Sequence, residues 1–276
     1  MTTTLVELCA GSAAVSLRWL HPRAKPPIAY QGGKRAYADA ILLAMGLRPG
    51  GGQRDGRVVL VEAGPWGEAW AHWAAGGIPD TVARLRAWAS EDPRALWTRL
   101  KDAPVPAGRA ERVAVWAMIQ RGSFGGFPAF VIDGRWRWSQ RAGRATPHTS
   151  VGPRMEIDAV DVAEIARRVG ALPSLSRAEV RHGDARAVEP VPGAIVVIDP
   201  PYVGTTGYGC SLSRDEVIGL AQRWRSVGAA VAVCESEPLP IAGWHAHQIA
   251  SGEWLTMSQR PVGVLNFGPV AIGSTS

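Results

Sequence analysis

The sequence predicts an α/β protein with one mostly parallel sheet and helices on both faces of that sheet. Short apolar runs alternate with amphipathic stretches of helical length in the first and last parts of the chain. These runs do not alternate between polar and apolar residues as half-exposed strands do. Continuous apolar runs of this kind are typical of strands buried in parallel sheets. A chain of 276 residues is long enough to bury one such core and to carry a smaller insertion.

The N-terminal segment LVELCAGSAAVSLRWL predicts a strand, a turn of small residues and the start of a helix. Small side chains let a ligand approach the backbone closely, and the N-terminus of the following helix lies nearby. The arrangement is typical of sites for nucleotide-like cofactors, and simple packing of a strand against a helix is the alternative interpretation. The residues of this turn are Cys9, Ala10, Gly11, Ser12 and Ala13.

Two further segments carry candidate binding residues. Gly32, Gly33 and Lys34 open an amphipathic stretch, and glycines with a lysine at a helix start can hold a carboxylate. Their spacing differs from that of a phosphate-binding Walker loop. The apolar run RVVLV ends at Glu62, and an acid at the end of a strand accepts hydrogen bonds from ribose hydroxyls in doubly wound folds. Glu62 is equally suited to cap a helix that starts near Pro65.

The segment 78–172 has a different character. Helical stretches rich in Ala, Arg and Trp lead to FPAFVI and RWRWS, which flank Asp133 and Gly134 and so predict a β-hairpin with a tight turn. A period of two places Arg135 and Arg137 on one face and the tryptophans on the other. Arginines suit phosphates and guanine edges, while tryptophans either stack on bases or pack into the core. A solvated basic face over an aromatic core is the alternative to nucleic-acid binding. We predict contacts with nucleic acid from Arg121, Arg135, Trp136, Arg137, Trp138, Arg141 and Arg144.

The last third of the chain returns to the alternation of strands and helices. EVRHG predicts a strand edge that ends at Asp184, AAVAVCES a buried strand, and RPVGVLNFG a closing strand. SRDEVIGLAQRW begins with the Ser-x-x-Glu pattern of a capping box and predicts a helix. With right-handed crossovers these elements complete the sheet. We therefore expect one domain from residues 1–77 and 173–276, with residues 78–172 inserted as a second domain.

The apolar run IVVI predicts a strand buried on both faces, and Asp199, Pro200, Pro201 and Tyr202 follow it directly. Open α/β sheets bind their ligands at this end of the strands. Asp199 supplies a carboxylate acceptor, the prolines stiffen the backbone, and Tyr202 offers a flat ring for stacking. An acceptor, a fixed carbonyl and a ring suit a flipped base that carries an exocyclic amine. A plain strand-ending turn is the alternative interpretation.

The composition favours an intracellular protein that binds phosphate-bearing partners. The formal net charge of +6 comes mostly from arginine, which suits nucleic acid, and high-GC coding bias is the alternative source of these arginines. The three cysteines and the histidines have no spacing typical of a disulfide framework or a metal site. The sequence shows neither a basic leader nor an apolar run of membrane-spanning length. We therefore expect a cytoplasmic protein without a metal, a membrane contact or an obligate protein partner.

The chain resembles the Dam-type DNA N6-adenine methyltransferases. The strongest match is HGDARAVEPVPGAIVVIDPPYVGTTGYGCSLSRDEVIGLAQRW. It is similar to the family's run from its acidic cofactor position through Asp-Pro-Pro-Tyr to a helix that begins after a serine and an acid, and VAVCESE and RPVGVLNFG extend the match. IQRGSFGGFPAFVIDGRWRW resembles the family's target-recognition hairpin, and YQGGK resembles its Trp-x-Gly-Gly-Lys cofactor loop. Two features depart from the family. The loop Cys9 to Ala13 stands where the family has Phe-x-Gly-x-Gly, and the Gly-Gly-Lys segment follows this loop instead of preceding it.

The resemblance implies a Rossmann-like sheet, S-adenosylmethionine as methyl donor, and a target-recognition domain that binds double-stranded DNA. It implies that the loop at residues 9–13 shapes the cofactor site and that Glu62 and Asp184 meet the cofactor's ribose and adenine. It also implies that Asp199 and the Pro200 carbonyl accept hydrogen bonds from the target amine while Tyr202 stacks on the base. The residues implied for the methionine end of the cofactor are Tyr30, Gly32, Gly33 and Lys34.

We therefore expect a site-specific enzyme that transfers a methyl group from S-adenosylmethionine to the N6 atom of a flipped adenine in duplex DNA. Transfer to another base amine, such as cytosine N4, or from an altered donor is one alternative. A DNA-binding protein that has kept the fold without catalysis is another. An acid at position 199 favours adenine by resemblance to the family.

Overall fold

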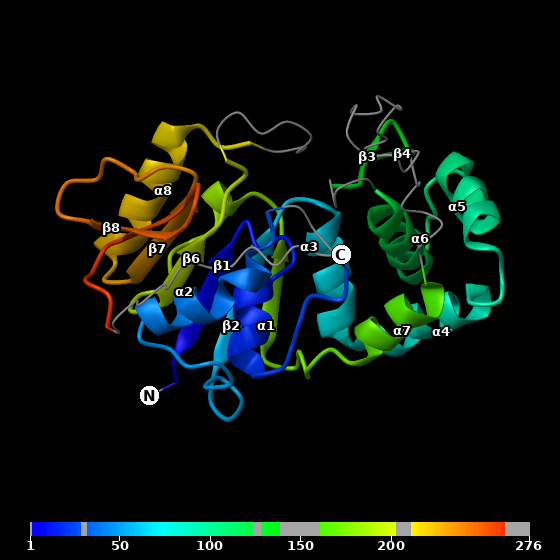
Figure 1. Ribbon diagram of the computed structural model, residues 1–276, viewed down its shortest axis with the longest axis horizontal. Coiled ribbons are helices and arrows are strands. Elements are labelled where there is room, and N and C mark those ends of the chain that lie inside the picture. Colours follow the sequence, from blue (N-terminus) through cyan, green and yellow to red (C-terminus); the bar gives the residue numbers. More distant parts are fainter. Residues whose placement is uncertain (1, 29–31, 124–127, 139–160, 203–210, 263–276) are drawn as a thin grey trace.

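A computed structural model describes residues 2–28, 32–123, 128–138, 161–202 and 211–262 (Figure 1). Its centre is a seven-stranded sheet in the spatial order β5-β2-β1-β6-β7-β9-β8. The α/β class and the single mostly parallel sheet predicted from the sequence are confirmed. The strands of this sheet are β1 (Thr4–Leu8), β2 (Arg57–Glu62), β5 (Ala178–His182), β6 (Ile195–Ile198), β7 (Ala230–Glu235), β8 (His245–Ala250) and β9 (Glu253–Met257).

The neighbouring strands β5, β2, β1, β6 and β7 run parallel to one another, and β9 runs antiparallel to both β7 and β8. The order of connection reverses beside β1, whose neighbours are β2 on one side and β6 on the other. In open α/β sheets a crevice for ligands forms at such a reversal, outside the carboxyl ends of the strands. A crevice for a ligand is therefore expected at the carboxyl ends of β1, β2 and β6.

Helices cover both faces of the sheet, as the sequence predicted. Along β2 the side chains of Val58 and Leu60 enter one hydrophobic cluster, and those of Val59 and Val61 enter the other. Helices α1, α2 and α3 pack on the first face, and α8 packs on the second. Ser213 caps α8 through the capping box predicted from the sequence. The bounds of these helices are α1 (Ala14–Leu20), α2 (Ala38–Ala44), α3 (Pro65–His72) and α8 (Arg214–Ser226).

Four further helices and a hairpin lie beyond α3, on one side of the molecule in Figure 1. They are α4 (Ile78–Trp88), α5 (Pro93–Asp102), α6 (Arg109–Gly122) and α7 (Val162–Gly170), with strands β3 (Phe130–Ile132) and β4 (Arg135–Arg137). A π-helical turn, η2 (Trp73–Gly77), joins α3 to α4. The predicted helices and hairpin of this segment are thus present.

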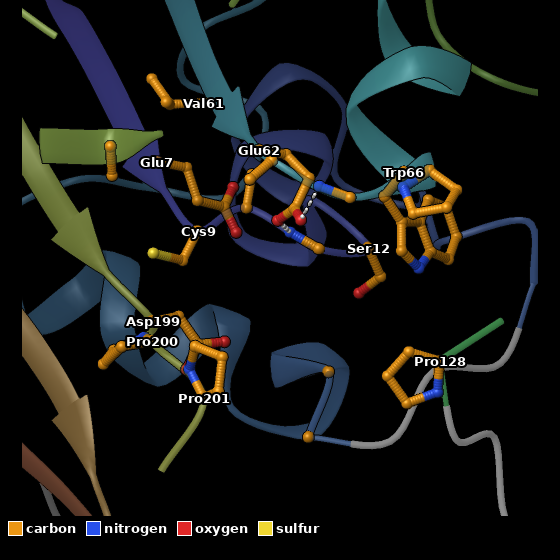
Figure 2. Close-up of a pocket in the computed structure, with 18 of the residues that line it drawn as sticks. Glu7, Cys9, Ser12, Val61, Glu62, Trp66, Pro128, Asp199, Pro200 and Pro201 are labelled. Atoms are coloured by element: carbon orange, nitrogen blue, oxygen red, sulfur yellow. Dashed lines mark hydrogen bonds between the residues drawn. The ribbon is translucent and has the colours of Figure 1, made fainter. Parts of the chain in front are cut away.

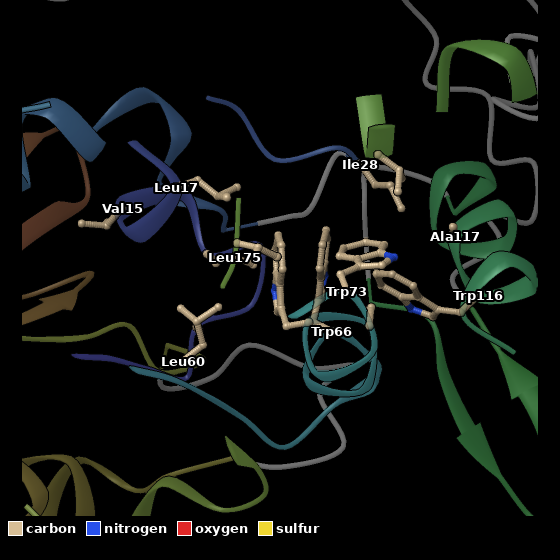
Figure 3. Close-up of a cluster of buried hydrophobic side chains, with 14 of the residues drawn as sticks. Val15, Leu17, Ile28, Leu60, Trp66, Trp73, Trp116, Ala117 and Leu175 are labelled. Carbon is tan, nitrogen blue, oxygen red and sulfur yellow. The ribbon is translucent and has the colours of Figure 1, made fainter. Parts of the chain in front are cut away.

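The segment does not have a hydrophobic core of its own in the described residues. Its buried side chains belong to the cluster that also covers the first face of the sheet. Tryptophans join the two parts: Trp66 lies edge-on to Trp116 with 4.7 Å between ring centroids (Figure 3). Within α3, Trp66 also stacks on Trp70. The two parts are therefore joined by one continuous hydrophobic cluster, to which α3 and α6 both contribute rings. The division into a domain of residues 1–77 and 173–276 and an inserted domain of residues 78–172 stays a prediction.

The C-terminal part differs from the sequence-based expectation. Strands β8 and β9 form an antiparallel pair that was not predicted. The predicted strand RPVGVLNFG begins at Arg260, and most of it lies outside the described residues. β5 ends at His182, so Asp184 follows the strand instead of closing it.

Candidate active site

A cavity of about 710 Å³ opens at the carboxyl ends of β1, β2 and β6 (Figure 2). It lies at the reversal in strand order, where the fold directs ligands. The structure brings together at this cavity nearly all the predicted cofactor and catalytic residues that it describes. Those that line it are Cys9, Ala10, Gly11, Ser12, Gly32, Gly33, Lys34, Glu62, Asp184, Asp199, Pro200, Pro201 and Tyr202.

The small-residue turn after β1 is wound tightly. Cys9, Gly11 and Ala13 all have positive φ values, of 57°, 45° and 51°. Positive φ is unusual for residues other than glycine and is kept only where surrounding contacts hold it. Trp70 Nε1 donates to the Gly11 carbonyl at 2.8 Å and supplies one such contact. Ala13 is the N-cap of α1 and is buried; it does not line the cavity, so its part is to turn the chain.

Glu62 joins the two loops on either side of the cavity. Its Oε2 accepts from the Gly11 amide at 2.8 Å, and its Oε1 accepts from the Gly64 amide at 2.9 Å (Figure 2). Burial raises the pKa of this carboxyl, and the two amide donors oppose the rise. Gly64 is the N-cap of α3, which begins at Pro65, so the capping interpretation of Glu62 is correct in part. A ribose hydroxyl would use the lone pairs that these amides leave.

Asp184 lies at the edge of the cavity with its carboxylate already engaged. It accepts from the Arg186 amide at 2.8 Å and from the Arg186 side chain, whose Nη2 lies 2.6 Å from Oδ2. These donors lower the pKa of Asp184. Arg186 also pairs with Glu216 of α8. The predicted contact of Asp184 with an adenine therefore requires one of these bonds to be shared.

Lys34 lies directly beside Asp199. Its Nζ is 2.9 Å from Asp199 Oδ1, donates to the Gly32 carbonyl at 2.9 Å, and lies 4.6 Å from the centroid of the Tyr202 ring. The lysine is 2% exposed. The predicted affinity of this segment for a carboxylate is thus met by a carboxylate of the protein. The Gly-Gly-Lys segment, which follows the first loop in the chain, lies at the same cavity as that loop.

Burial and charge act together on the titratable groups of this region. Burial raises the pKa of Asp199 from 3.8 to about 6, although the Lys34 ammonium lowers it. Burial is the largest single effect on Lys34 and lowers its pKa, but the combined attraction of neighbouring acidic groups, Asp199 first and Glu253 among them, outweighs burial, so the net change is upward. Burial and the neighbouring Asp199 carboxylate raise the pKa of Tyr202, so its phenol stays protonated. Lys34 is therefore a permanent cation, and Asp199 is mostly ionised at neutral pH.

Several lining residues were not predicted from the sequence. Glu7 is a buried acid in β1, and Glu253 is the first residue of β9. An acid within the apolar run LVEL was a signal for Glu7 that the sequence already contained. Trp66 of α3 forms another wall, in a site whose turn at residues 9–13 has no aromatic residue. The hairpin contributes residues 128–132, so the segment 78–172 reaches the cavity directly.

The hairpin of β3 and β4 has the predicted form. Asp133 and Gly134 have φ values of 50° and 70°, as a two-residue turn with two left-handed positions requires. Arg135 and Arg137 are exposed on one face, while Trp136 is 2% exposed on the other. The prediction that Trp136 contacts nucleic acid is therefore wrong, because its ring is packed in the core.

Other predicted residues of this region have different surroundings. Trp138 lies edge-on to Trp97 with 5.3 Å between ring centroids, and Lys101 Nζ lies 5.8 Å from the centroid of its ring. Arg121 is partly buried in the last turn of α6. Tyr30, Arg141 and Arg144 lie outside the described residues.

The cavity is acidic although the protein is basic. Six of the described lining residues are acids, and three are basic. Two of the basic residues are held by acids, Lys34 by Asp199 and Arg186 by Asp184. Burial raises the pKa of Glu7 and Glu62, and Glu68 is paired with Arg112, so the excess of negative charge is smaller than the number of acids. The sign of this excess still favours a ligand with positive charge. The acids are Glu7, Glu62, Glu68, Asp184, Asp199 and Glu253; the basic residues are Lys34, His182 and Arg186.

The described ranges lack the features of two other kinds of site. They contain no group of three or more His, Cys, Asp or Glu side chains placed to hold a metal ion. No helix within the same ranges has the length and apolar character needed to cross a membrane. In comparison with known proteins, no family model matches the chain and no curated protein matches its sequence.

Proposed function

We propose that this protein transfers a methyl group from S-adenosylmethionine to the exocyclic amine of a flipped adenine in duplex DNA. The observation that carries the proposal is the position of Asp199, Pro200, Pro201 and Tyr202. They line one cavity with the small-residue turn after β1 and with the Gly-Gly-Lys segment. Three segments far apart in sequence, two of which resemble methyltransferase motifs, therefore meet at a single site.

The charges of the cavity suit the proposed donor. S-adenosylmethionine carries a positively charged sulfonium and supplies an electrophilic methyl group when bound. The acidic lining favours such a cation and disfavours a phosphate-bearing cofactor such as a dinucleotide. The residues that would hold the donor are the turn at Cys9 to Ser12, the segment from Gly32 to Lys34, Glu62, and the edge near Asp184. Because Gly11 has no side chain and a φ of 45°, its backbone is open to close approach.

The residues after β6 act by positioning the target base. Asp199 is ionised at neutral pH, so its carboxylate accepts a hydrogen bond from the target amine. The Pro200 carbonyl is the second acceptor, and two prolines in succession limit the backbone motion of this turn. The Tyr202 ring provides a stacking surface for the base. Two acceptors fix the direction of the amine's lone pair, and the amine needs no general base before transfer because its proton leaves afterwards.

The hairpin supports duplex DNA as the substrate. Arg135 and Arg137 are exposed on β4, and residues 128–132, in β3 and directly before it, line the cavity that would receive the base. Phosphate contacts from such arginines position a protein on the duplex. A hairpin that touches both the DNA surface and the base pocket would couple binding of the duplex to entry of the base.

Transfer of labelled methyl groups tests the proposal. Purified protein is incubated with S-adenosylmethionine labelled in the methyl group and, in parallel, with duplex DNA, single-stranded DNA or RNA of mixed sequence. We expect incorporation into duplex DNA and its loss in Asp199→Ala, which retains affinity for S-adenosylmethionine by calorimetry. Affinity without incorporation in any nucleic acid would contradict the proposed substrate. Absence of affinity would favour a DNA-binding protein without catalysis.

A further inference from the structure

Glu253 reaches the candidate active site from the far end of the chain. It is the first residue of β9, which runs antiparallel to β7. Because β9 is reversed, its first residue lies at the edge of the sheet where the parallel strands end. β6 ends at that same edge, directly before Asp199. The reversed strand thus delivers an acid to the place where the proposed target base binds.

Glu253 contacts two residues of the site. Its Oε2 accepts a hydrogen bond from the Tyr202 hydroxyl, and the same oxygen lies 3.6 Å from Lys34 Nζ. Lys34 in turn contacts Asp199 Oδ1 and covers one face of the Tyr202 ring. Asp199 and Glu253 are 15% and 18% exposed. Together Lys34, Asp199, Tyr202 and Glu253 form a mostly buried cluster, which we call the base-site cluster.

The contacts of Glu253 restrain the two groups that would hold the base. The Tyr202 backbone follows the rigid prolines, and the bond from its hydroxyl to Glu253 fixes the far end of the ring. A ring held at both ends cannot rotate away from its stacking position. Glu253 also shares the Lys34 ammonium with Asp199, so the ammonium is held between two carboxylates instead of one. Charge-assisted bonds of this kind are strong when they are shielded from water.

We propose that Glu253 is a positioning residue for the target base. It acts through the Tyr202 hydroxyl and the Lys34 ammonium, keeping the ring plane and the Asp199 carboxylate in fixed relation. This inference rests on the proposed methyl transfer, because it assigns a residue to the base site of that reaction.

Graded substitutions test the inference. Glu253→Met removes the contacts with Tyr202 and Lys34 while keeping a side chain of similar length, and Glu253→Gln keeps an oxygen that can accept from the phenol. Tyr202→Phe removes the hydrogen bond to Glu253 while keeping the ring. Glu237→Gln is the matched control, since Glu237 is an exposed acid, 73% exposed, paired with Arg214. Steady-state kinetics give kcat and the KM for S-adenosylmethionine of each variant, and thermal unfolding checks its fold.

We expect kcat to fall about tenfold or more in Glu253→Met and less in Glu253→Gln, because small misplacements of reacting groups slow transfer strongly. The KM for S-adenosylmethionine should stay within about twofold, since Glu253 and Tyr202 are assigned to the base and Lys34, the cluster residue implied for the methionine end of the donor, is unchanged in these variants. Tyr202→Phe should lower kcat too, and combining it with Glu253→Met should cost less than the product of the two single effects. Glu237→Gln should behave as the wild type.

If the wild type is active and kcat is unchanged in Glu253→Met and in Tyr202→Phe, the role of Glu253 is overturned while the proposed function is not. Fully multiplicative effects in the double variant would do the same. A wild type that transfers no methyl group would overturn the proposed function and the role of Glu253 with it. If Glu253→Met fails to fold, Tyr202→Phe decides the outcome, because it lacks the same bond.

Discussion

Replacing Glu7 by Gln should remove a pH-dependent loss of stability from the fold. Glu7 is 2% exposed in β1, and its Oε2 accepts from the Ser16 amide at 2.8 Å. Burial raises its pKa from 4.5 to about 7, against the lowering effect of its bonds to Ser16. The folded protein therefore holds this proton more tightly than the unfolded chain does. Its free energy of unfolding must fall as the pH rises from about 4.5 to about 7, and level off above that range.

The magnitude follows from the pKa change. A rise from 4.5 to about 7, at about 1.36 kcal/mol per unit, corresponds to about 3 kcal/mol over the full range. Between pH 5 and pH 8.5 the free energy of unfolding should change by about 2–3 kcal/mol from this group. Glu7→Gln keeps an oxygen that can accept from Ser16 but cannot ionise, so it should lose this dependence. The variant should gain stability relative to the wild type as the pH rises.

Urea denaturation at several pH values between 5 and 8.5 measures the effect. The difference in free energy of unfolding between Glu7→Gln and the wild type is the quantity of interest, because other titrating groups cancel in it. Each transition must be two-state with equal slopes for the comparison to hold. A difference that stays constant over this pH range would refute the reasoning, since Glu7 would then titrate alike in both states.

Three further predictions concern activity and packing. Because Asp199 must be ionised to accept a hydrogen bond and its pKa is about 6, kcat should decrease as the pH falls below about 6. Lys34→Met removes the charge that lowers this pKa, so the decrease in kcat should begin at a higher pH in the variant, and coincident pH profiles would contradict the ion pair. Replacing Arg135 and Arg137 together by Gln should reduce the salt dependence of DNA binding by about two in log–log slope, and an unaltered slope would place both arginines off the DNA. Trp136→Ala should lower the free energy of unfolding by about 3–5 kcal/mol in chemical denaturation, and an unchanged value would contradict burial of its ring.

Local sequence patterns were sufficient for the elements that are buried or tightly turned. The run IVVI and the following turn at Asp199 could be predicted because an uninterrupted apolar run of this length suits a buried strand and is too short for a helix. The hairpin could be predicted because Asp133 and Gly134 both tolerate positive φ. In each case the physical cause lies within a few residues of the feature.

Other features depend on contacts between distant segments. The strand beginning at His245 lies at the edge of the sheet and mixes polar with apolar residues, so it lacks the apolar run of a central strand. Glu253 therefore carried no sequence signal, because its position follows from pairing of β9 with β7. The pairing of Lys34 with Asp199 likewise joins two segments that only the folded chain brings together. Period two separated the faces of the hairpin correctly, but it could not decide whether Trp136 meets DNA or the core.

Mass spectrometry of nucleosides tests the central claim most directly. Unmodified duplex DNA of mixed sequence is incubated with the protein and S-adenosylmethionine, with Asp199→Ala as the control, and is then digested completely to nucleosides. The account predicts N6-methyladenine in the wild-type reaction and its absence in the control. A methylated cytosine in place of N6-methyladenine, or equal product from both proteins, would contradict the assignment of Asp199 to an adenine amine.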